Sequence, residues 1–323
     1  MSYQPTAYNS QTFTPQPNPR EKQSWSERMH KRGEVFPFSQ VNDCIATSAV
    51  RTPKPSVLNS EVGVDDFWTH QQMQPYTFVR WAGIYMFLAG LAKFVLMFIY
   101  PMAVLATIAM LIYGEADPKG ILYFFIETTI YLAVIPLLLY SPILWINWRN
   151  PKVDKTNLSL FARKKHCLNR ETGMVTLYGE HNRKIFSHPF IEFDCILASN
   201  PNHQGLLSYR LMLVHRYSDY AQGVNIGSLV GVNAPLAEYR RLWNMIQQYM
   251  DVSKPLPDIP MLEQFRELDP TTAAYDQQHQ RNPNYWRSMS DEEFDKTLTE
   301  MARNQREQNI PPTGPEIDIF AKA

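Results

Sequence analysis

The sequence predicts an α+β protein that joins a two-helix transmembrane hairpin to an antiparallel β-sheet domain with a C-terminal helix and a helical tail. Three observations support this fold class. Two long apolar runs interrupt an otherwise polar chain of 323 residues. Short runs with strand-like alternation follow them, and a strongly amphipathic helical segment closes the series of strands.

Composition excludes several classes of protein. The chain carries 31 Lys and Arg against 31 Asp and Glu, so no net charge attracts it to nucleic acid. Its negative mean hydropathy excludes a channel or transporter built mostly of lipid-facing helices. Cys44, Cys167 and Cys195 are widely spaced and form no C-x-x-C pair, which indicates a reducing compartment without disulfides.

Residues 1–60 are rich in Gln, Pro, Ser, Thr and Asn and offer little apolar surface. We therefore expect most of this cytoplasmic arm to be disordered. The first residues contain no apolar run with a cleavage pattern, so we expect no cleaved signal peptide. The segment 35–50, VFPFSQVNDCIATSAV, has a strand-like apolar pattern, and it either folds back onto the sheet domain or binds a partner.

The hairpin, residues 81–150, contains two predicted spans at about 94–113 and 121–146. The first span has about 20 residues without a charge, which at about 1.5 Å per residue matches the roughly 30 Å hydrocarbon layer. The turn GEADPKG separates it from the second span. A buried hairpin of a soluble protein is the alternative, but core helices rarely carry two adjacent runs of this length. We also expect Trp81 and Tyr85 to anchor a short interfacial helix.

Flanking charges predict the orientation of the hairpin. Basic residues precede the first span and follow the second, whereas the connecting turn holds only Lys119 beside Glu115 and Asp117. Because positive charge collects on the cytoplasmic side, both termini are predicted to be cytoplasmic. The basic positions are Arg80, Lys93, Arg149, Lys152, Lys155, Arg163, Lys164 and Lys165.

Glu127 lies inside the second predicted span, where an ionised carboxylate is costly. In a hairpin that is symmetric about Asp117, Thr107 lies at the same depth as Glu127. We therefore expect a protonated Glu127 that hydrogen-bonds with Thr107, or with Thr128 and Thr129. Glu127 is either a functional site or part of a contact that pins the two helices.

Residues 157–251 are predicted to form the cytoplasmic sheet domain. HCLNRETGMVTLYG fits two strands around the turn ETG at 171–173, and further strands follow in RKIFSHPFIEFDCIL, LLSYRLMLVHRYS and GVNIGSLVG. Asn233 is expected to cap a helix that begins near Ala234. The apolar face of this helix holds Leu236, Tyr239, Leu242, Trp243, Ile246 and Met250.

Residues 252–323 are predicted to form a Pro-rich linker, KPLPDIP, and a helical tail. Residues 261–268 are expected to form a short helix, and Ser290 with Glu293 fits the capping box of a longer one. The apolar stripe of this longer helix is thin, so we expect it to bind a partner; packing back on the same protein is the alternative. The candidate partner-binding residues are Tyr285, Trp286 and Phe294.

The order of elements in 157–251 resembles a bacterial pleckstrin-homology-like domain, in which a C-terminal helix plugs a curved antiparallel sheet. The hairpin followed by FARKKHCLNRETGMVTLYG, AEYRRLWNMIQQYMD and NPNYWRSMSDEEF resembles an uncharacterised bacterial family of two-span membrane proteins found beside type VI secretion effector genes. This resemblance covers roughly residues 35–294. It implies the bacterial inner membrane and an immunity or adaptor role, with an effector or secretion component as partner.

No chemistry is predicted for the sheet domain. Its candidate ligands match no zinc spacing, and its two cysteines fit buried apolar positions better than ligand positions. These candidate ligands are His166, Cys167, His181, His188 and Cys195. Serine nucleophile motifs, phosphate-binding loops and dinucleotide fingerprints are absent. We therefore predict no enzyme, no cofactor and no metal.

Two classes of function remain. The preferred one is a non-catalytic protein-binding module tethered to the inner membrane, with the lipid bilayer and a protein as partners and no nucleic acid; homo-oligomerisation stays open. The alternative is a membrane-anchored sensor of anionic lipid that uses Arg163, Lys164 and Lys165. Each of these cations contributes about 1 kcal/mol near an anionic surface, but inside-positive topology also explains them.

Overall fold

The protein is a mixed α+β chain with two long apolar helices and antiparallel sheets, as the sequence predicts. Its described residues form two compact units. The helix-pair unit lies within Tyr76–Arg163, and the sheet unit lies within Met1–Ser60, Asp66–Pro75 and Lys164–Ala323. The computed structural model describes residues 3–19, 33–41, 45–47, 49–50, 68–78, 80–113, 117–149, 162–201, 207–230, 234–307 and 314–320.

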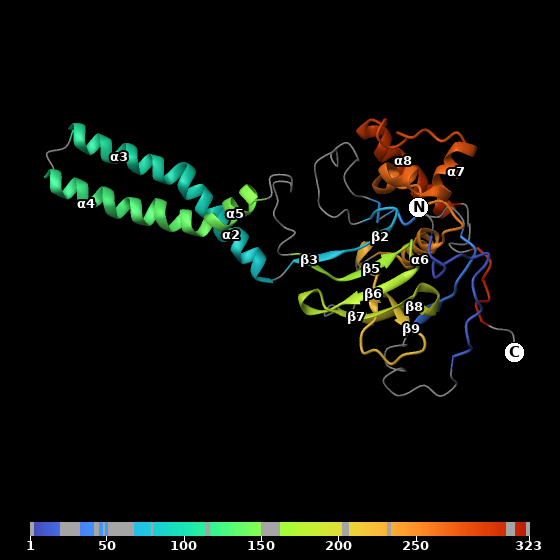
Figure 1. Ribbon diagram of the computed structural model, residues 1–323. Coiled ribbons are helices and arrows are strands. Elements are labelled where there is room, and N and C mark those ends of the chain that lie inside the picture. The colour runs from blue at the N-terminus through green and yellow to red at the C-terminus, as the bar shows by residue number, and fades with distance from the viewer. Residues whose placement is uncertain are drawn as a thin grey trace. The chain divides into compact units, whose positions relative to one another are not determined.

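Two long helices lie side by side and antiparallel in the helix-pair unit (Figure 1). Within the described part of the chain, two stretches are long and apolar enough to cross a membrane, Gly83–Tyr113 with 31 residues and Pro118–Trp145 with 28. At about 1.5 Å per residue, both exceed the roughly 30 Å hydrocarbon layer. Their segments are α2 (Arg80–Phe94), η1 (Val95–Ile99), α3 (Tyr100–Tyr113), α4 (Pro118–Thr129), η2 (Ile130–Val134) and α5 (Ile135–Arg149).

Both long helices continue past an internal proline through a π-helical turn. The π turn η1 precedes Pro101 and the π turn η2 precedes Pro136. Proline lacks an N–H and its ring clashes with the carbonyl four residues earlier, which would break a regular α-helix. The wider π turn shifts the hydrogen-bonding register by one residue, so each helix continues through the proline.

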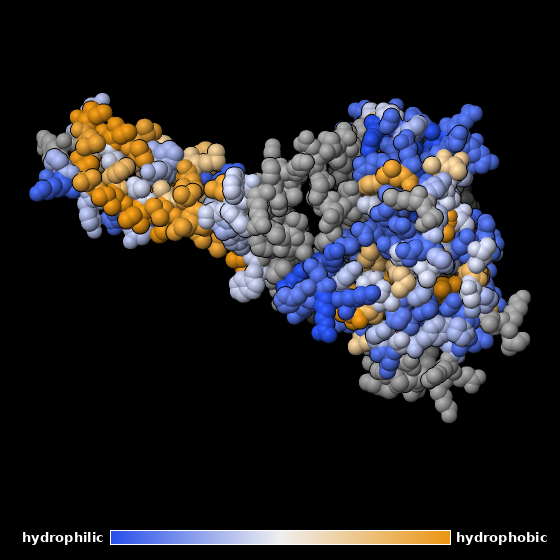
Figure 2. All heavy atoms as spheres, viewed as in Figure 1, coloured by the Kyte–Doolittle hydropathy of each residue, from blue (hydrophilic) through white to orange (hydrophobic). Residues whose placement is uncertain are grey.

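Side chains of the helix pair face outward along most of its length, and Figure 2 shows apolar residues gathered over it. Small residues among the buried positions let the two backbones approach closely. The buried positions among the described residues are Ala89, Ala92, Thr107, Ile121 and Pro136.

The separate interfacial helix expected around Trp81 and Tyr85 is absent from the described residues, because both belong to α2, which runs on into η1. The Tyr85 hydroxyl instead donates a hydrogen bond to the Leu139 carbonyl of α5 at 3.2 Å. Tyr85 therefore joins the two long helices.

Two four-stranded antiparallel sheets form the centre of the sheet unit, with strand orders β1-β8-β9-β10 and β2-β5-β6-β7. A further pair joins β3 (Tyr76–Phe78) to β4 (Ala162–Lys164). The sheet strands are β1 (Glu34–Phe36), β2 (Gln72–Met73), β5 (His166–Asn169), β6 (Met174–Tyr178), β7 (Lys184–Pro189), β8 (Phe193–Pro201), β9 (Leu207–His215) and β10 (Val224–Asn225). Short 3₁₀ turns are η4 (Glu180–Asn182), η5 (Phe190–Glu192) and η6 (Gly227–Leu229).

The hairpin of β5 and β6 forms around the predicted turn ETG. Gly173 has φ +69°, a conformation that favours glycine, and a Cβ at this position would lie 2.2 Å from the Thr6 carbonyl oxygen. The close approach of the N-terminal arm therefore also requires glycine. In the other sheet, β8 and β9 pair along nine residues, from Phe193 opposite His215 to Pro201 opposite Leu207.

Helix α6 (Leu236–Met250) packs against both sheets through its predicted apolar face, and Tyr239, Leu242 and Trp243 are fully buried there. The structure begins the helix after Pro235, and the predicted cap Asn233 lies outside the described residues. The predicted strands and this closing helix therefore share one hydrophobic core.

The polar face of α6 is also buried, which the sequence does not indicate. Ser39 of the arm donates its backbone N–H to Gln247 Oε1 at 2.8 Å. Arg241 donates to the Gln305 carbonyl of the tail at 3.2 Å. Because the arm and the tail contact its outer face, α6 is buried on both faces.

The N-terminal arm is packed on the sheet unit in its described residues, so the expectation of a mostly disordered arm is wrong for residues 3–19 and 33–41. Tyr8 is buried, with its ring centroid 5.5 Å from that of Phe190, and its carbonyl accepts from Val252 N–H. Strand β1 pairs with β8 and Phe38 is buried, so the described part of segment 35–50 folds back onto the sheet unit, as one of the two alternatives predicted.

The tail contains η7 (Pro260–Leu268), α7 (Pro270–Gln278) and α8 (Asp291–Glu307). The predicted capping box is present, because Ser290 N–H donates to Glu293 Oε2 at 2.9 Å and Glu293 N–H donates to Ser290 Oγ at 3.2 Å. Leu298 and Met301 of α8 pack against the hydrophobic core of the sheet unit. The tail helix therefore uses its thin apolar stripe within its own chain.

Candidate functional site

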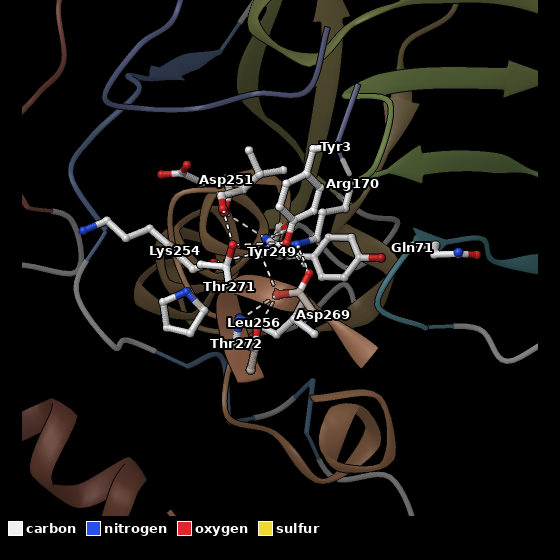
Figure 3. A network of polar contacts seen from close by, with 12 residues as sticks. Tyr3, Gln71, Arg170, Tyr249, Asp251, Lys254, Leu256, Asp269, Thr271 and Thr272 are labelled. Atoms are coloured by element: carbon white, nitrogen blue, oxygen red, sulfur yellow. Dashed lines mark hydrogen bonds and ion pairs between the residues drawn. The ribbon is translucent and has the colours of Figure 1, made fainter. Parts of the chain in front are cut away.

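Arg170 is the centre of a buried polar network in the described sheet unit (Figure 3). It follows β5, is fully buried, and pairs with Asp269 through Nε at 3.0 Å and Nη2 at 3.2 Å. Its remaining N–H groups donate to four carbonyls near the end of α6, those of Gln248, Tyr249, Asp251 and Lys254. One guanidinium thus satisfies helix C-terminal carbonyls that would otherwise lack partners.

Asp269 in turn begins α7. Its Oδ2 accepts from Thr272 N–H at 3.0 Å, and its Oδ1 accepts from the Tyr3 hydroxyl at 2.7 Å. Burial alone would raise the pKa of Asp269, but the Arg170 charge and the hydrogen bonds from Thr272, Arg170 and Tyr3 outweigh it and hold this pKa below its usual value. This network joins the arm, β5, α6 and α7, so its role is structural.

The predicted partner anchors of the tail lie inside its fold. Trp286 is 1% exposed and Phe294 is 7% exposed, and their rings pack edge to face at 5.8 Å. Tyr285 keeps a 39% exposed side chain. Trp286 and Phe294 therefore pack on the same protein, which is the alternative named above, and their candidate role in partner binding stays a prediction.

The predicted lipid contacts lie at the start of the sheet domain and are half-buried. Arg163 and Lys164 belong to β4, and the Lys164 ammonium lies 5.9 Å from the centroid of the Tyr178 ring. Lys165 follows β4 and donates its backbone N–H to the Pro75 carbonyl. In the part of the chain that the structure describes, no ion pair joins Arg163, Lys164 or Lys165 to a carboxylate.

The predicted pair of Glu127 and Thr107 does not form. Thr107 is buried on α3, and its hydroxyl donates to the Ala103 carbonyl of the same helix at 2.9 Å. Glu127 lies on α4 with an exposed side chain. Equal depth along the two helices does not bring these side chains together, because Thr107 is buried whereas Glu127 is exposed on its helix.

Cys167 and Cys195 are buried, as predicted for small apolar side chains. Burial raises the pKa of Cys167 to about 11 and that of Cys195 well above its usual value. A thiol with a raised pKa is a poor nucleophile and a poor metal ligand at neutral pH.

The structure assembles a different set of chemical groups at one edge of the sheet unit. His188 lies near the end of β7, Glu192 is the last residue of η5, and His215 ends β9. Because Phe193 pairs with His215 across β8 and β9, the preceding Glu192 is carried to His215. One ligand atom from each side chain lies within 4.8 Å of the others.

Glu192 lies between the two imidazoles of this cluster. Its Oε2 is 2.9 Å from His215 Nε2 and 3.6 Å from His188 Nδ1. The Tyr220 hydroxyl lies 2.8 Å from the other ring nitrogen of His188, Nε2. Burial and the neighbouring His215 lower the pKa of His188, against the opposite effect of Glu192, so its imidazole is neutral at pH 7 and has a free lone pair.

Sequence reasoning missed two members of this cluster. The sequence pattern pointed to His188 but not to Glu192 or His215, and the other four candidate ligands lie outside the cluster. The available signal was the spacing of His188 and Glu192 by four residues, together with a histidine at the end of a predicted strand. Only the β8–β9 register brings His215 to them.

Comparison with protein-family models, with curated proteins and with solved structures gives no match to this chain.

Proposed function

We propose that the protein is a non-catalytic binding module tethered to a membrane, in which the helix pair spans the lipid and the sheet unit contacts a protein partner. One observation carries the proposal: both long helices expose large apolar side chains along their length. Burying one such side chain is worth about 1.5–3 kcal/mol, so water is an unfavourable environment for this surface. Examples are Phe87, Met102, Leu105, Leu111, Ile112, Leu122, Tyr131 and Leu138.

The proposed fold of the sheet unit is pleckstrin-homology-like. Two antiparallel meanders, β5-β6-β7 and β8-β9-β10, followed by α6, support this proposal. The arm adds β1 to one sheet, and the segment before the hairpin adds β2 to the other. These two added strands and the burial of α6 on both faces distinguish the chain from the simple arrangement expected from its sequence.

A protein-binding role is supported by the way the tail is fixed. The ion pairs of Arg170 with Asp269, Arg266 with Asp276 and Arg281 with Asp258 hold the tail segments in place. A preorganised surface lowers the entropy lost on binding. We propose the cytoplasmic face of the bacterial inner membrane as its location and an immunity or adaptor role in type VI secretion; this context rests on the sequence resemblance.

Cysteine labelling tests the tether and its orientation. In a Cys44→Ser background, Asp117→Cys is expected to react with a membrane-impermeant reagent in intact cells, because the proposed orientation puts Asp117 outside the cytoplasm. Gln278→Cys, at an exposed position of α7, is expected to react only after permeabilisation. The background chain without an added cysteine is the control. Labelling of Gln278→Cys but not Asp117→Cys in intact cells would contradict the proposal.

Recognition of anionic lipid is the second candidate function, and the lack of described carboxylate partners for Arg163, Lys164 and Lys165 favours it. The test replaces all three by glutamine in the full chain and measures the anionic lipid that remains bound after purification in detergent. If the protein is only a tether, we expect the amount of bound anionic lipid to change little. A sensor would lose about 3 kcal/mol, or roughly 100-fold in affinity, and the difference would be larger at low salt.

A further inference from the structure

We propose that His188, Glu192 and His215 form a binding site for a divalent transition metal, with Zn²⁺ as the best-fitting ion. This inference goes beyond the proposed tether function. The three residues come from β7, η5 and β9, so the site depends on the fold of the sheet unit and not on a local motif.

The spacing of the ligand atoms fits a metal. Zinc binds imidazole nitrogen and carboxylate oxygen at about 2.0–2.2 Å in a tetrahedron, which places neighbouring ligand atoms about 3.3–3.6 Å apart. The Glu192 oxygen lies 2.9 Å from His215 Nε2 and 3.6 Å from His188 Nδ1. The ligand nitrogens of His188 and His215 lie within 4.8 Å of each other, so a shift of up to about 1 Å in the partly exposed His188 side chain would seat an ion between the three side chains.

The surroundings orient one of these ligands. With Nδ1 of His188 facing the ion, its Nε2–H points to the Tyr220 hydroxyl at 2.8 Å, which is the outer hydrogen bond typical of metal-bound histidine. The Tyr220 ring stacks on Phe186 at 4.6 Å, which fixes its position.

His215, the third ligand, is buried although one of its ring nitrogens lacks a hydrogen bond within the described part of the chain. His215 is only 4% exposed, yet its Nδ1 has no hydrogen-bond partner among the described residues. A buried polar atom without a hydrogen-bond partner lowers the stability of the fold. A metal bond at Nε2 would supply free energy that offsets this cost.

The ligand types select the metal. Two imidazole nitrogens and one carboxylate oxygen suit Zn²⁺ and similar transition metals, whereas Mg²⁺ and Ca²⁺ prefer oxygen ligands alone. Arg216 lies beside the site, but its Nε pairs with Asp194 at 2.8 Å, which balances that positive charge. The side chains of His188 and Glu192 are 28% and 27% exposed, so solvent or a partner side chain can supply the fourth ligand.

Metal titration of the full chain in detergent tests the site. The protein carries no histidine tag, is stripped with a chelator and is titrated with Zn²⁺; Co²⁺ is titrated in parallel, because its visible absorption reports tetrahedral coordination. We expect about one equivalent to bind. His188→Gln and Glu192→Gln are each expected to weaken Zn²⁺ affinity by more than about 100-fold, and Tyr220→Phe by about 10–100-fold.

His279→Gln is the matched control, because His279 is exposed on the tail and its substitution is expected to leave the affinity unchanged. The two ligand variants alter partly exposed side chains, and their denaturant midpoints show whether they fold. Absence of stoichiometric Zn²⁺ binding in the wild type would overturn the proposal. Equal affinity in the wild type and in folded Glu192→Gln would also overturn it, because the ion would then bind elsewhere.

Discussion

Replacement of Arg170 by methionine is expected to lower the free energy of unfolding of the sheet unit by about 3–5 kcal/mol. Arg170 and Asp269 have side-chain exposures of 0% and 1%, so the substitution leaves a buried carboxylate without its counterion. It also removes the donors that Arg170 supplies to carbonyls at the end of α6. The unbranched methionine fills much of the space of the arginine stem, so the effect arises mainly from lost polar contacts.

Pulse proteolysis of the detergent-solubilised full chain in increasing urea measures this effect, because it reports unfolding of the sheet unit without requiring the helix pair to unfold. Arg240→Met is the matched control. Arg240 pairs with Glu34 at 2.6 Å, but the two side chains are 38% and 48% exposed, and such a pair contributes about 0–1 kcal/mol. Equal midpoints for Arg170→Met and Arg240→Met would contradict the structural role of the network.

The same network predicts a dependence on pH. The pKa of Asp269 is lower in the folded protein than in the unfolded chain, so the unfolded state binds more protons as the solution is acidified. The stability from this group is present at neutral pH and is lost below about pH 4–5, as the pH falls through the unfolded value near 4 and toward the lower folded value. Asp258, whose pKa is also lowered, adds to the same acid loss.

Short sequence patterns correctly predict those helices and turns whose formation depends only on residues close together in the chain. The two long helices follow from uninterrupted apolar runs, the β5–β6 hairpin follows from a turn with a glycine that adopts positive φ, and α8 starts at a predicted capping box. Each signal lies within a few residues of the element that it specifies. The first long helix begins at Arg80, before the predicted start of the span near residue 94. The π turn η1 joins α2 to α3 without a break.

Contacts between distant residues are the ones that the sequence does not reveal. Arg170 looks like an ordinary charge beside a turn, yet its partner Asp269 lies 99 positions away. The outer face of α6 looks solvent-exposed because its residues are polar, but the arm and the tail supply their hydrogen-bond partners. The proposed metal site also depends on a contact between distant residues, because only the register of β8 and β9 brings His215 to Glu192.

Trp286→Ala is expected to destabilise the sheet unit by about 3–5 kcal/mol and to lower the amount of protein in the membrane. The substitution opens a cavity next to Phe294, because the Trp286 side chain is almost completely buried. It also removes the bond from Trp286 Nε1 to Asp258 Oδ1 at 2.9 Å. The backbone N–H of this residue donates to buried Glu263 Oε1 at 2.7 Å. Loosening this segment therefore also disturbs the ion pairs of Glu263 with Arg281 and Arg287.

Three variants separate this structural role from partner binding. Tyr285→Ala is the matched control, because its exposed ring leaves no comparable cavity and a change of about 0.5 kcal/mol or less is expected. Trp286→Phe keeps a buried ring but loses the bond to Asp258, so an intermediate loss of about 1–3 kcal/mol is expected. Urea midpoints from pulse proteolysis and the amount of protein in the membrane are measured for each. If Trp286→Ala keeps the wild-type midpoint but loses a protein captured by cross-linking in intact membranes, then Trp286 is a partner anchor, and the packing of the tail on its own chain is wrong.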